Sequence, residues 1–299
     1  EAHPTKTDIL VAVHNVEHVT GYNAQHFVLM ANGIDPWLGG DGSWGDRLSA
    51  VACFSQCHVD LLTATRPSIA PEICCVTGLG VELQDYVGEQ KPVVGRILFA
   101  NDPARGLWHV IDIFDCIRQE RPDVELRIAY DFARQFENWR WQANAIAERL
   151  WGCQERIERG DGVVNLGGLS RAELIAEQFS CDLHIMPSDP PNVGSQIHGL
   201  TQLEMAAAGV PMVLSDIEAF PEMFGGCATI LPLPGTMARA GEDFERIDAA
   251  DWAESALRLL RDPGAWLGAS QVGRLVAAEH TWSNVLDRWQ AMLSKLELD

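Results

Sequence analysis

The sequence is most informative at Ser188-Asp-Pro-Pro-Asn-Val-Gly-Ser-Gln-Ile-His-Gly-Leu-Thr-Gln-Leu-Glu-Met-Ala-Ala-Ala-Gly-Val-Pro211. This stretch leaves an apolar strand, passes through a loop of small residues and enters an alanine-rich helix predicted over Leu200–Ala208. Free backbone N–H groups and the positive end of the helix dipole are then expected at the carboxyl end of a parallel sheet. Because phosphate groups bind at such places, the stretch predicts a site for a phosphate-bearing ligand.

Strands and helices alternate regularly around this stretch. The expected strands are Arg96–Ala100, Glu125–Tyr130, Val163–Leu166, Asp182–Met186, Pro211–Ser215 and Ala228–Leu231. The expected helices between them are Gly106–Gln119, Asn138–Glu158, Arg171–Phe179 and Leu200–Ala208. The strands are apolar almost throughout and the helices are amphipathic, which is typical of a parallel sheet covered on both faces. We therefore predict an α/β fold with a doubly wound, Rossmann-like domain in the C-terminal part.

The N-terminal part alternates less regularly. Its short expected strands are Ile9–Val13, Phe27–Met30, Ala50–Phe54 and Ile73–Val76, with a helix over Ser55–Thr63. The pattern breaks at Gly88–Pro92, which indicates a linker. Three closing helices are expected at Ala249–Arg261, Trp266–Ala278 and Trp282–Leu296. The prediction is an incomplete Rossmann-like domain over 1–92 and a larger domain, closing helices included, over 93–299.

Composition limits the possible partners. The chain of 299 residues carries 42 acidic and 22 basic residues, a net charge of −20 that repels nucleic acid. A small anion can still bind where a helix N-terminus and one arginine meet. The eight cysteines lack metal-binding spacing and indicate reduced thiols in a cytoplasmic protein. The sequence contains no apolar run of membrane-spanning length and no signal-peptide pattern, and its start at Glu1 suits a fragment or a processed chain.

Two turns after predicted strands carry candidate binding residues. Arg105 follows an Asp-Pro turn after the strand Arg96–Ala100, so its guanidinium is expected over the carboxyl end of the sheet, where it suits phosphate oxygens. The alternative is a surface arginine at the start of a helix. Gly167 and Gly168 follow the strand Val163–Leu166 and precede a Ser-x-x-Glu capping box. This turn either caps a helix only or also lines a flat pocket for a nucleobase.

The central stretch contains two more candidates. Glu204 lies one turn into the helix Leu200–Ala208, where its carboxylate can accept two hydrogen bonds from vicinal hydroxyls such as those of a ribose. The same carboxylate could simply complement the helix dipole. His198 precedes Gly199 beside the expected phosphate site, so it is either an ordinary loop histidine or a catalytic residue.

Several short motifs follow one another over residues 95–232. They are Asp-Pro-x-Arg-Gly-Leu, Gly-Gly-Leu-Ser-x-x-Glu-Leu, a strand ending in Met-Pro-Ser, Gly-Leu-x-x-x-Glu-x-x-Ala-x-Gly-Val-Pro, and Ser215-Asp-Ile-Glu-Ala-Phe-Pro-Glu222. Each motif alone is common, but their order resembles that of the retaining GT-B glycosyltransferases of the family-4 type. The resemblance is to a member with a shortened N-terminal domain.

The resemblance implies a retaining, metal-independent transferase that needs no cofactor. Its donor would be a nucleotide-diphosphate sugar, and its acceptor an unidentified glycan, lipid or small molecule. The residues implied to bind the donor are Arg105, Gly168, Leu169, Gly199, Leu200, Thr201 and Glu204. By analogy with the family, the arginine and the amides of 199–201 contact the diphosphate, the glutamate holds the ribose, and Gly168 with Leu169 borders the nucleobase.

The sequence also departs from this family. Gln196, which with His198 is a candidate catalytic residue, occupies the position of the first glutamate in the family's Glu-x7-Glu pair. An amide still hydrogen-bonds sugar hydroxyls, but it supports less positive charge on the reacting sugar. In the short first domain, Ala31-Asn32 replaces a frequent His-Asp. These departures favour a non-catalytic module that binds a nucleotide sugar or a partner protein, whereas the retained Arg105 and Glu204 favour an enzyme.

Two other classes fit less well, and a third stays open. A nicotinamide enzyme would need a third glycine after Gly78-x-Gly80, where the chain has Leu83. A metal-dependent GT-A glycosyltransferase would need an Asp-x-Asp pair, which the sequence lacks. A nucleotide-sugar epimerase of the same fold would share the phosphate-binding residues and differ on the acceptor side.

Overall fold

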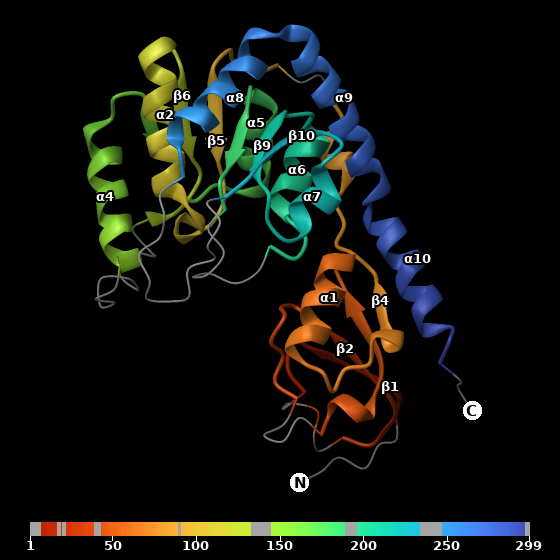
Figure 1. Ribbon diagram of the computed structural model, residues 1–299. Helices are drawn as coiled ribbons and strands as arrows, with labels where there is room; N and C mark the ends of the chain where they lie inside the picture. Colours follow the sequence, from red (N-terminus) through yellow and green to blue (C-terminus); the bar gives the residue numbers. More distant parts are fainter. Residues whose placement is uncertain are drawn as a thin grey trace. The chain divides into compact units, whose positions relative to one another are not determined.

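The structure is a computed structural model. It describes residues 7–16, 19, 22–38, 43–88, 91–132, 145–188, 196–233 and 247–296. The chain divides into two compact units, and Figure 1 labels most of their helices and strands. The first unit comprises Glu1–Val81, Ser195–Gly199 and His280–Asp299, and the second unit comprises Glu82–Gly194 and Leu200–Glu279.

The second unit is built on parallel strands. They are β5 (Arg96–Phe99), β6 (Glu125–Ile128), β7 (Val163–Asn165), β8 (His184–Met186), β9 (Met212–Ser215) and β10 (Ala228–Leu231). Two ladders run in the orders β10-β9-β8 and β5-β6-β7, and a parallel bridge between Ile97 and Leu183 connects them. Counted from the first strand of this unit, the combined order is the 3-2-1-4-5-6 arrangement of Rossmann-type sheets. The predicted doubly wound, Rossmann-like domain is therefore confirmed.

Helices cover both faces of this sheet. They are α2 (Leu107–Glu120), α4 (Ala145–Arg159), α5 (Arg171–Ser180), α6 (Leu200–Ala208), α7 (Ala219–Phe224), α8 (Ala249–Arg261) and α9 (Pro263–Glu279). Right-handed crossovers place α2 and α4 on one face and α5, α6 and α7 on the other. Helix α8 packs against α2, and α9 packs against α6. Residues spaced by three and four give α2 its buried face, namely Leu107, Val110, Ile111, Phe114 and Ile117.

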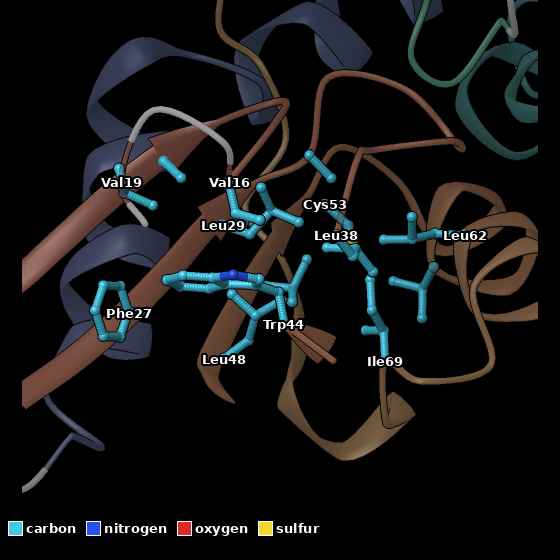
Figure 2. Packing of buried hydrophobic residues seen from close by; sticks show 14 residues of the cluster. Val16, Val19, Phe27, Leu29, Leu38, Trp44, Leu48, Cys53, Leu62 and Ile69 are labelled. Carbon is cyan, nitrogen blue, oxygen red and sulfur yellow. The ribbon is translucent and has the colours of Figure 1, made fainter. Parts of the chain in front are cut away.

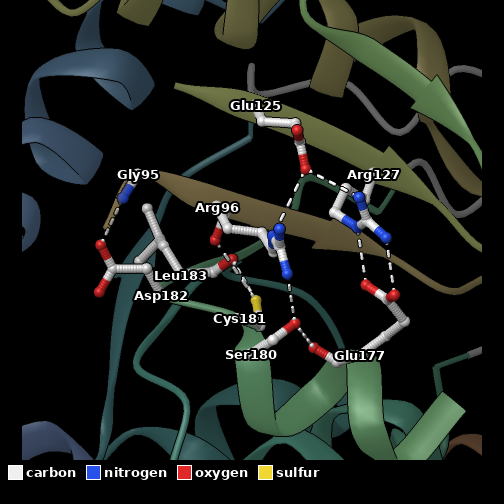
Figure 3. A network of polar contacts seen from close by, with 9 residues as sticks. All are labelled: Gly95, Arg96, Glu125, Arg127, Glu177, Ser180, Cys181, Asp182 and Leu183. Carbon is white, nitrogen blue, oxygen red and sulfur yellow. Dashed lines mark hydrogen bonds and ion pairs between the residues drawn. The ribbon is translucent and has the colours of Figure 1, made fainter. Parts of the chain in front are cut away.

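Polar contacts connect neighbouring elements at the amino ends of the central strands (Figure 3). Asp182, which precedes β8, accepts a hydrogen bond of 2.7 Å from the backbone N–H of Gly95, which precedes β5. Arg127 of β6 donates two hydrogen bonds of 2.7 Å each to the carboxylate of Glu177 at the end of α5. The two ladders are thus held together by side chains as well as by the bridge between their strands.

The first unit has a parallel sheet in the order β1-β2-β3-β4. Its elements are β1 (Thr7–Val13), β2 (Ala24–Met30), β3 (Leu48–Cys53), β4 (Cys74–Val76), α1 (Gln56–Thr65) and α10 (Trp282–Leu293). Figure 2 shows the apolar cluster on one face of this sheet, where Phe27 meets the edge of Trp44 with ring centroids 5.1 Å apart. On the other face, Met292 of α10 packs with Val28 and the neighbouring alanines of β3.

The predicted helices and strands lie close to the observed ones, with instructive exceptions. The helix expected over Asn138–Glu158 is observed as α4 from Ala145, and 138–144 lie outside the described residues. The short helix α7 was not expected, because six residues containing Pro221 show no helical period. The sequence groups all closing helices with the larger domain, whereas α10 lies on the sheet of the first unit. The domain limits 1–92 and 93–299 stay a prediction.

Candidate functional site

In the sheet of the second unit, the chain adds strands to one side of β5 first and then, from β8 on, to the other side. The strand order therefore reverses between β5 and β8. Ligands of open α/β sheets bind outside the carboxyl ends of the strands at such a switch point, because the connections on either side diverge. The loop after β5 reaches Gly106, which has a φ of +111°, and the loop after β8 begins at Pro187. A Cβ atom on Gly106 would lie 2.6 Å from the carbonyl oxygen of Pro187. Only glycine therefore allows these two loops to approach so closely.

Arg105 lies at the end of the loop that follows β5. A short 3-10 helix, Pro103–Arg105, is capped by Asp102, whose Oδ1 accepts a hydrogen bond of 2.9 Å from the N–H of Ala104. Partial burial lowers the pKa of the Arg105 guanidinium, while the carboxylates of Asp102 and Glu218 act in the opposite direction. An arginine remains charged in proteins despite such a shift. A half-buried cation thus lies at the switch point, as the sequence predicts for its position.

Glu218 also faces this region, and sequence reasoning missed it. It precedes α7 at the carboxyl end of β9, and its φ of 46° with ψ of −117° lies outside the conformations that side-chain-bearing residues favour. Such strain costs of order 1–3 kcal/mol and is concentrated at functional sites. The residue is part of the quoted motif Ser215–Glu222, but no sequence pattern reveals a strained backbone.

The turn after β7 contains Gly168 and Leu169. Gly167 has a φ of +70°, and its N–H donates a hydrogen bond of 3.0 Å to the side chain of Asn165. A Cβ on Gly168 would lie 3.3 Å from the Cβ of Asp131, so this turn lies against the residues that follow β6. The predicted capping box of Ser170 and Glu173 is present at the start of α5. The turn is therefore a helix cap in which Gly168 stays exposed.

Glu204 on α6 is bound by two side chains from α5. Arg171 donates a hydrogen bond of 2.5 Å to Oε1, and Gln178 donates one of 3.2 Å to Oε2. The side chain of Glu204 is 14% exposed and that of Arg171 is 44% exposed. The structure thus brings Glu204 next to the helix that follows the Gly168 turn. The two residues on α5 were not identified from the sequence, because 33 and 26 positions separate them from Glu204.

The start of α6 provides backbone donors. Gly199 has a φ of +82°, and Leu200 and Thr201 form the first turn of the helix. The first N–H groups of a helix have no partner within it, and the helix dipole gives them a partial positive charge. The side chain of Leu200 is exposed and that of Thr201 is half-buried, so this helix start is accessible.

Gln196 and His198 belong to the first unit and are both buried. Nε2 of His198 accepts a hydrogen bond of 3.1 Å from the N–H of Leu79, and Ser55 binds the carbonyl of Ile197 at 2.7 Å. Burial lowers the pKa of His198 to about 3, with smaller effects of His280, Arg288 and His58. The imidazole is therefore neutral at pH 7, and its proton lies on Nδ1. These contacts tie Ile197 and His198 to the segments that follow β3 and β4 in the first unit.

Two features are absent from the described part of the chain, a metal-binding group of side chains and a membrane-spanning helix. Within it, no three His, Cys, Asp or Glu side chains are grouped so that they could hold a metal ion. Among its helices, none has both the length and the apolar character that crossing a membrane requires.

Comparison with known proteins gives fold-level similarity. No family model and no curated protein matches the sequence. TarM of S. aureus, solved with fondaparinux, α-GlcNAc-glycerol and UDP, has a TM-score of 0.62 and 13% identity over 90% of this chain and 51% of its own. HepE of Anabaena, solved with UDP and glucose, has a TM-score of 0.64 and 16% identity over 91% of this chain and 72% of its own.

A third structure is the pneumococcal O-GlcNAc transferase GtfA with UDP and GlcNAc. It has a TM-score of 0.66 and 12% identity over 91% of this chain and 52% of its own. The chain thus spans about half the length of TarM and of GtfA. At these identities the similarity concerns the fold. The chain has the fold of the GT-B glycosyltransferases, and the α/β class with Rossmann-like domains that its sequence predicts is confirmed.

Proposed function

We propose that this chain is a glycosyltransferase that takes a sugar from a nucleotide-diphosphate donor, with UDP as the preferred nucleotide. The supporting observation is that Arg105, the N-terminus of α6 and Glu204 all belong to the carboxyl end of one Rossmann-like sheet. Proteins of similar fold have been solved with UDP, HepE together with glucose and GtfA together with GlcNAc. Because the chain spans about half of TarM and GtfA, the proposal concerns the donor side first.

The donor diphosphate is proposed to lie between Arg105 and the first turn of α6. A guanidinium gives charge-assisted hydrogen bonds to phosphate oxygens, and the N–H groups of 199–201 would add backbone donors. The ribose would bind Glu204, and the nucleobase would lie along Gly168 and Leu169. This local arrangement would overcome the repulsion between a diphosphate and a protein of net charge −20.

The transfer step follows from the resemblance to retaining enzymes. The bond between the sugar C1 and the diphosphate oxygen breaks, and the acceptor oxygen binds C1 on the same face. The acceptor proton passes to the departing diphosphate oxygen. Arg105 and the start of α6 would stabilise the negative charge that grows on this leaving group, so the proposed reaction needs no metal ion.

Gln196 and His198 remain the candidate catalytic residues predicted from the sequence. The amide of Gln196 can hydrogen-bond a sugar hydroxyl, but it contributes no full charge to the transition state. His198, with a pKa of about 3, is a poor general acid at neutral pH. We therefore propose that His198 holds residues 196–199 in position and that the departing diphosphate accepts the proton of the acceptor hydroxyl.

The donor proposal is tested by calorimetric titration with UDP, GDP and ADP. We expect UDP to bind most tightly and Arg105→Ala to weaken it at least about tenfold, since a charge-assisted contact contributes roughly 1.5–3 kcal/mol. Arg258→Ala is the matched control, because Arg258 is an exposed arginine on α8 that pairs with Glu254 four residues away. If no nucleotide binds, or if both variants bind alike, the proposal is wrong.

A second function is favoured by Gln196 and by Ala31-Asn32, which replaces a frequent His-Asp. The chain could bind a nucleotide sugar without transferring it, because the family's first glutamate is replaced. Release of UDP from UDP-sugars by the protein and by Gln196→Glu separates the two functions. Turnover by the unmodified protein supports the enzyme. UDP binding without turnover in the unmodified protein supports the binding module, whether or not Gln196→Glu restores turnover.

A further inference from the structure

The carboxylate of Glu204 is held in a closed ring of hydrogen bonds. Arg171 donates to Glu204 Oε1 at 2.5 Å and to the hydroxyl of Tyr86 at 3.3 Å. The Tyr86 hydroxyl donates to Oε1 of Gln178 at 2.8 Å, and Gln178 completes the ring by donating to Glu204 Oε2 at 3.2 Å. We call Arg171, Gln178 and Tyr86 the Glu204 clamp.

Burial fixes the direction of the hydrogen bonds in the Glu204 clamp. Gln178 and Tyr86 are buried, so each must satisfy its polar atoms within the protein. The Tyr86 hydroxyl fixes the carbonyl oxygen of the Gln178 amide, which leaves the amide nitrogen to face Glu204. Burial is the larger cause, and the carboxylate of Glu204 the next, of a raised pKa of Tyr86. The Tyr86 hydroxyl therefore keeps the proton that it donates. Asp85 adds an ion pair of 3.4 Å that holds Arg171 from the side of the 3-10 helix Leu83–Tyr86.

The clamp leaves Glu204 able to accept more hydrogen bonds. An ionised carboxylate has about four lone-pair sites, two on each oxygen. Arg171 and Gln178 each use one site, one on either oxygen. Among the described residues, one site therefore remains on each oxygen, and both sites have a fixed direction because the carboxylate cannot rotate without breaking the ring. Two neighbouring hydroxyls, such as the 2′ and 3′ hydroxyls of a ribose, fit two such acceptors.

We propose that Arg171, Gln178 and Tyr86 are positioning residues that orient Glu204 for the two ribose hydroxyls and so make the site select ribonucleotides over 2′-deoxyribonucleotides. This inference rests on the proposed function, because it takes the nucleotide to lie at Glu204. It goes beyond that function by assigning sugar selectivity to residues of α5 and of the segment that begins the second unit.

Tyr86→Phe is the sharpest test, because it removes only the hydroxyl and keeps the ring that packs against Phe179. Calorimetry compares the Kd of UDP with that of 2′-deoxy-UDP. We expect the intact protein to prefer UDP about tenfold, which corresponds to roughly 1.4 kcal/mol. We expect Tyr86→Phe to lower this preference about threefold through weaker UDP binding, with the Kd of 2′-deoxy-UDP unchanged within about twofold. Tyr22→Phe, a tyrosine of the first unit, is the control and should change neither Kd.

A second variant covers the case in which Tyr86→Phe folds poorly. Arg171→Lys acts at an exposed residue and keeps the charge but loses the two-pronged contact with Glu204 and Tyr86. It should reduce the preference for UDP in the same way. Equal weakening of both nucleotides, or an unchanged preference in both variants, overturns the clamp while UDP binding itself still supports the donor site. A protein that binds neither nucleotide overturns the clamp and the proposed function together.

Discussion

The two ends of the central strands in the second unit differ in how their polar groups are arranged. At the amino end, Arg127 and Glu177 form a two-pronged ion pair, and Asp182 binds the backbone of Gly95 (Figure 3). At the carboxyl end, Gly106 holds a left-handed conformation that only glycine adopts readily, and Glu218 is strained. The comparison shows that polar contacts stabilise the amino end of this sheet, whereas the unfavourable backbone conformations lie at its carboxyl end.

The physical reason for this division lies in the connections. At the amino end, helices lead into strands through short connections, such as the one from α5 to β8. Polar groups in these connections therefore hydrogen-bond to neighbouring protein groups. At the carboxyl end the connections on either side of β5 and β8 diverge and expose helix starts. Backbone N–H groups that are to bind phosphate must stay unsatisfied within the protein, so the proposed donor site needs a helix start that protein groups do not saturate, although side chains hold Glu204 nearby.

The largest effect is expected from Gly106→Ala. The new Cβ would lie 2.6 Å from the carbonyl of Pro187, and the φ of +111° would strain any residue with a side chain. We expect a loss of about 4 kcal/mol in the free energy of unfolding, measured by urea unfolding with tryptophan fluorescence. Gly152→Ala is the control, because a Cβ there meets no atom within 4 Å and the residue lies inside α4. That variant should be stabilised by about 1 kcal/mol, and equal effects of the two would contradict the close approach.

A moderate effect is expected at the amino end from Glu177→Gln. The variant replaces the carboxylate that accepts from Nε and Nη2 of Arg127, leaving that arginine with the longer contact of 3.0 Å between its Nη1 and Glu125. We expect a loss of about 1.5 kcal/mol in the same urea measurement, because the pair is mostly buried. The exposed pair Arg258–Glu254 offers the control, and Glu254→Gln should cost less than about 0.5 kcal/mol. A similar cost for both pairs would mean that the amino end adds no particular stability.

Sequence patterns predicted the layers of the second unit because apolar strands and amphipathic helices follow from local composition. The helix over Leu200–Ala208 and the strand over Ala228–Leu231 have the predicted limits, since a glycine or proline or a change of hydrophobic period marks their ends. The position of Arg105 was likewise predictable from an Asp-Pro turn after a strand. These features depend on neighbours within a few residues.

The remaining features depend on contacts between distant parts of the chain. Arg171 and Gln178 meet Glu204 only because α5 and α6 lie on one face of the sheet. The packing of α10 on the first unit is invisible to periodicity, which shows that a helix has an apolar face but not which sheet receives it. The burial of His198 is similar, because its partner Leu79 is 119 positions away.

The smallest effect is expected from Glu218→Gly. This variant at the carboxyl end should gain stability, whereas Glu177→Gln at the amino end should lose it. Glycine adopts the φ of 46° and ψ of −117° without a clash between Cβ and the backbone, so the substitution should relieve strain. The gain is partly offset because glycine loses more conformational freedom on folding, which leaves an expected stabilisation of about 0.5 kcal/mol. Glu222→Gly, inside α7, should instead destabilise by about 1 kcal/mol. Urea unfolding of both variants decides the matter, since a loss of stability at Glu218 would mean that its side-chain contacts outweigh the strain. A gain there, beside a loss at Glu177, would mean that only the carboxyl end departs from maximum stability, as a surface kept for a ligand should.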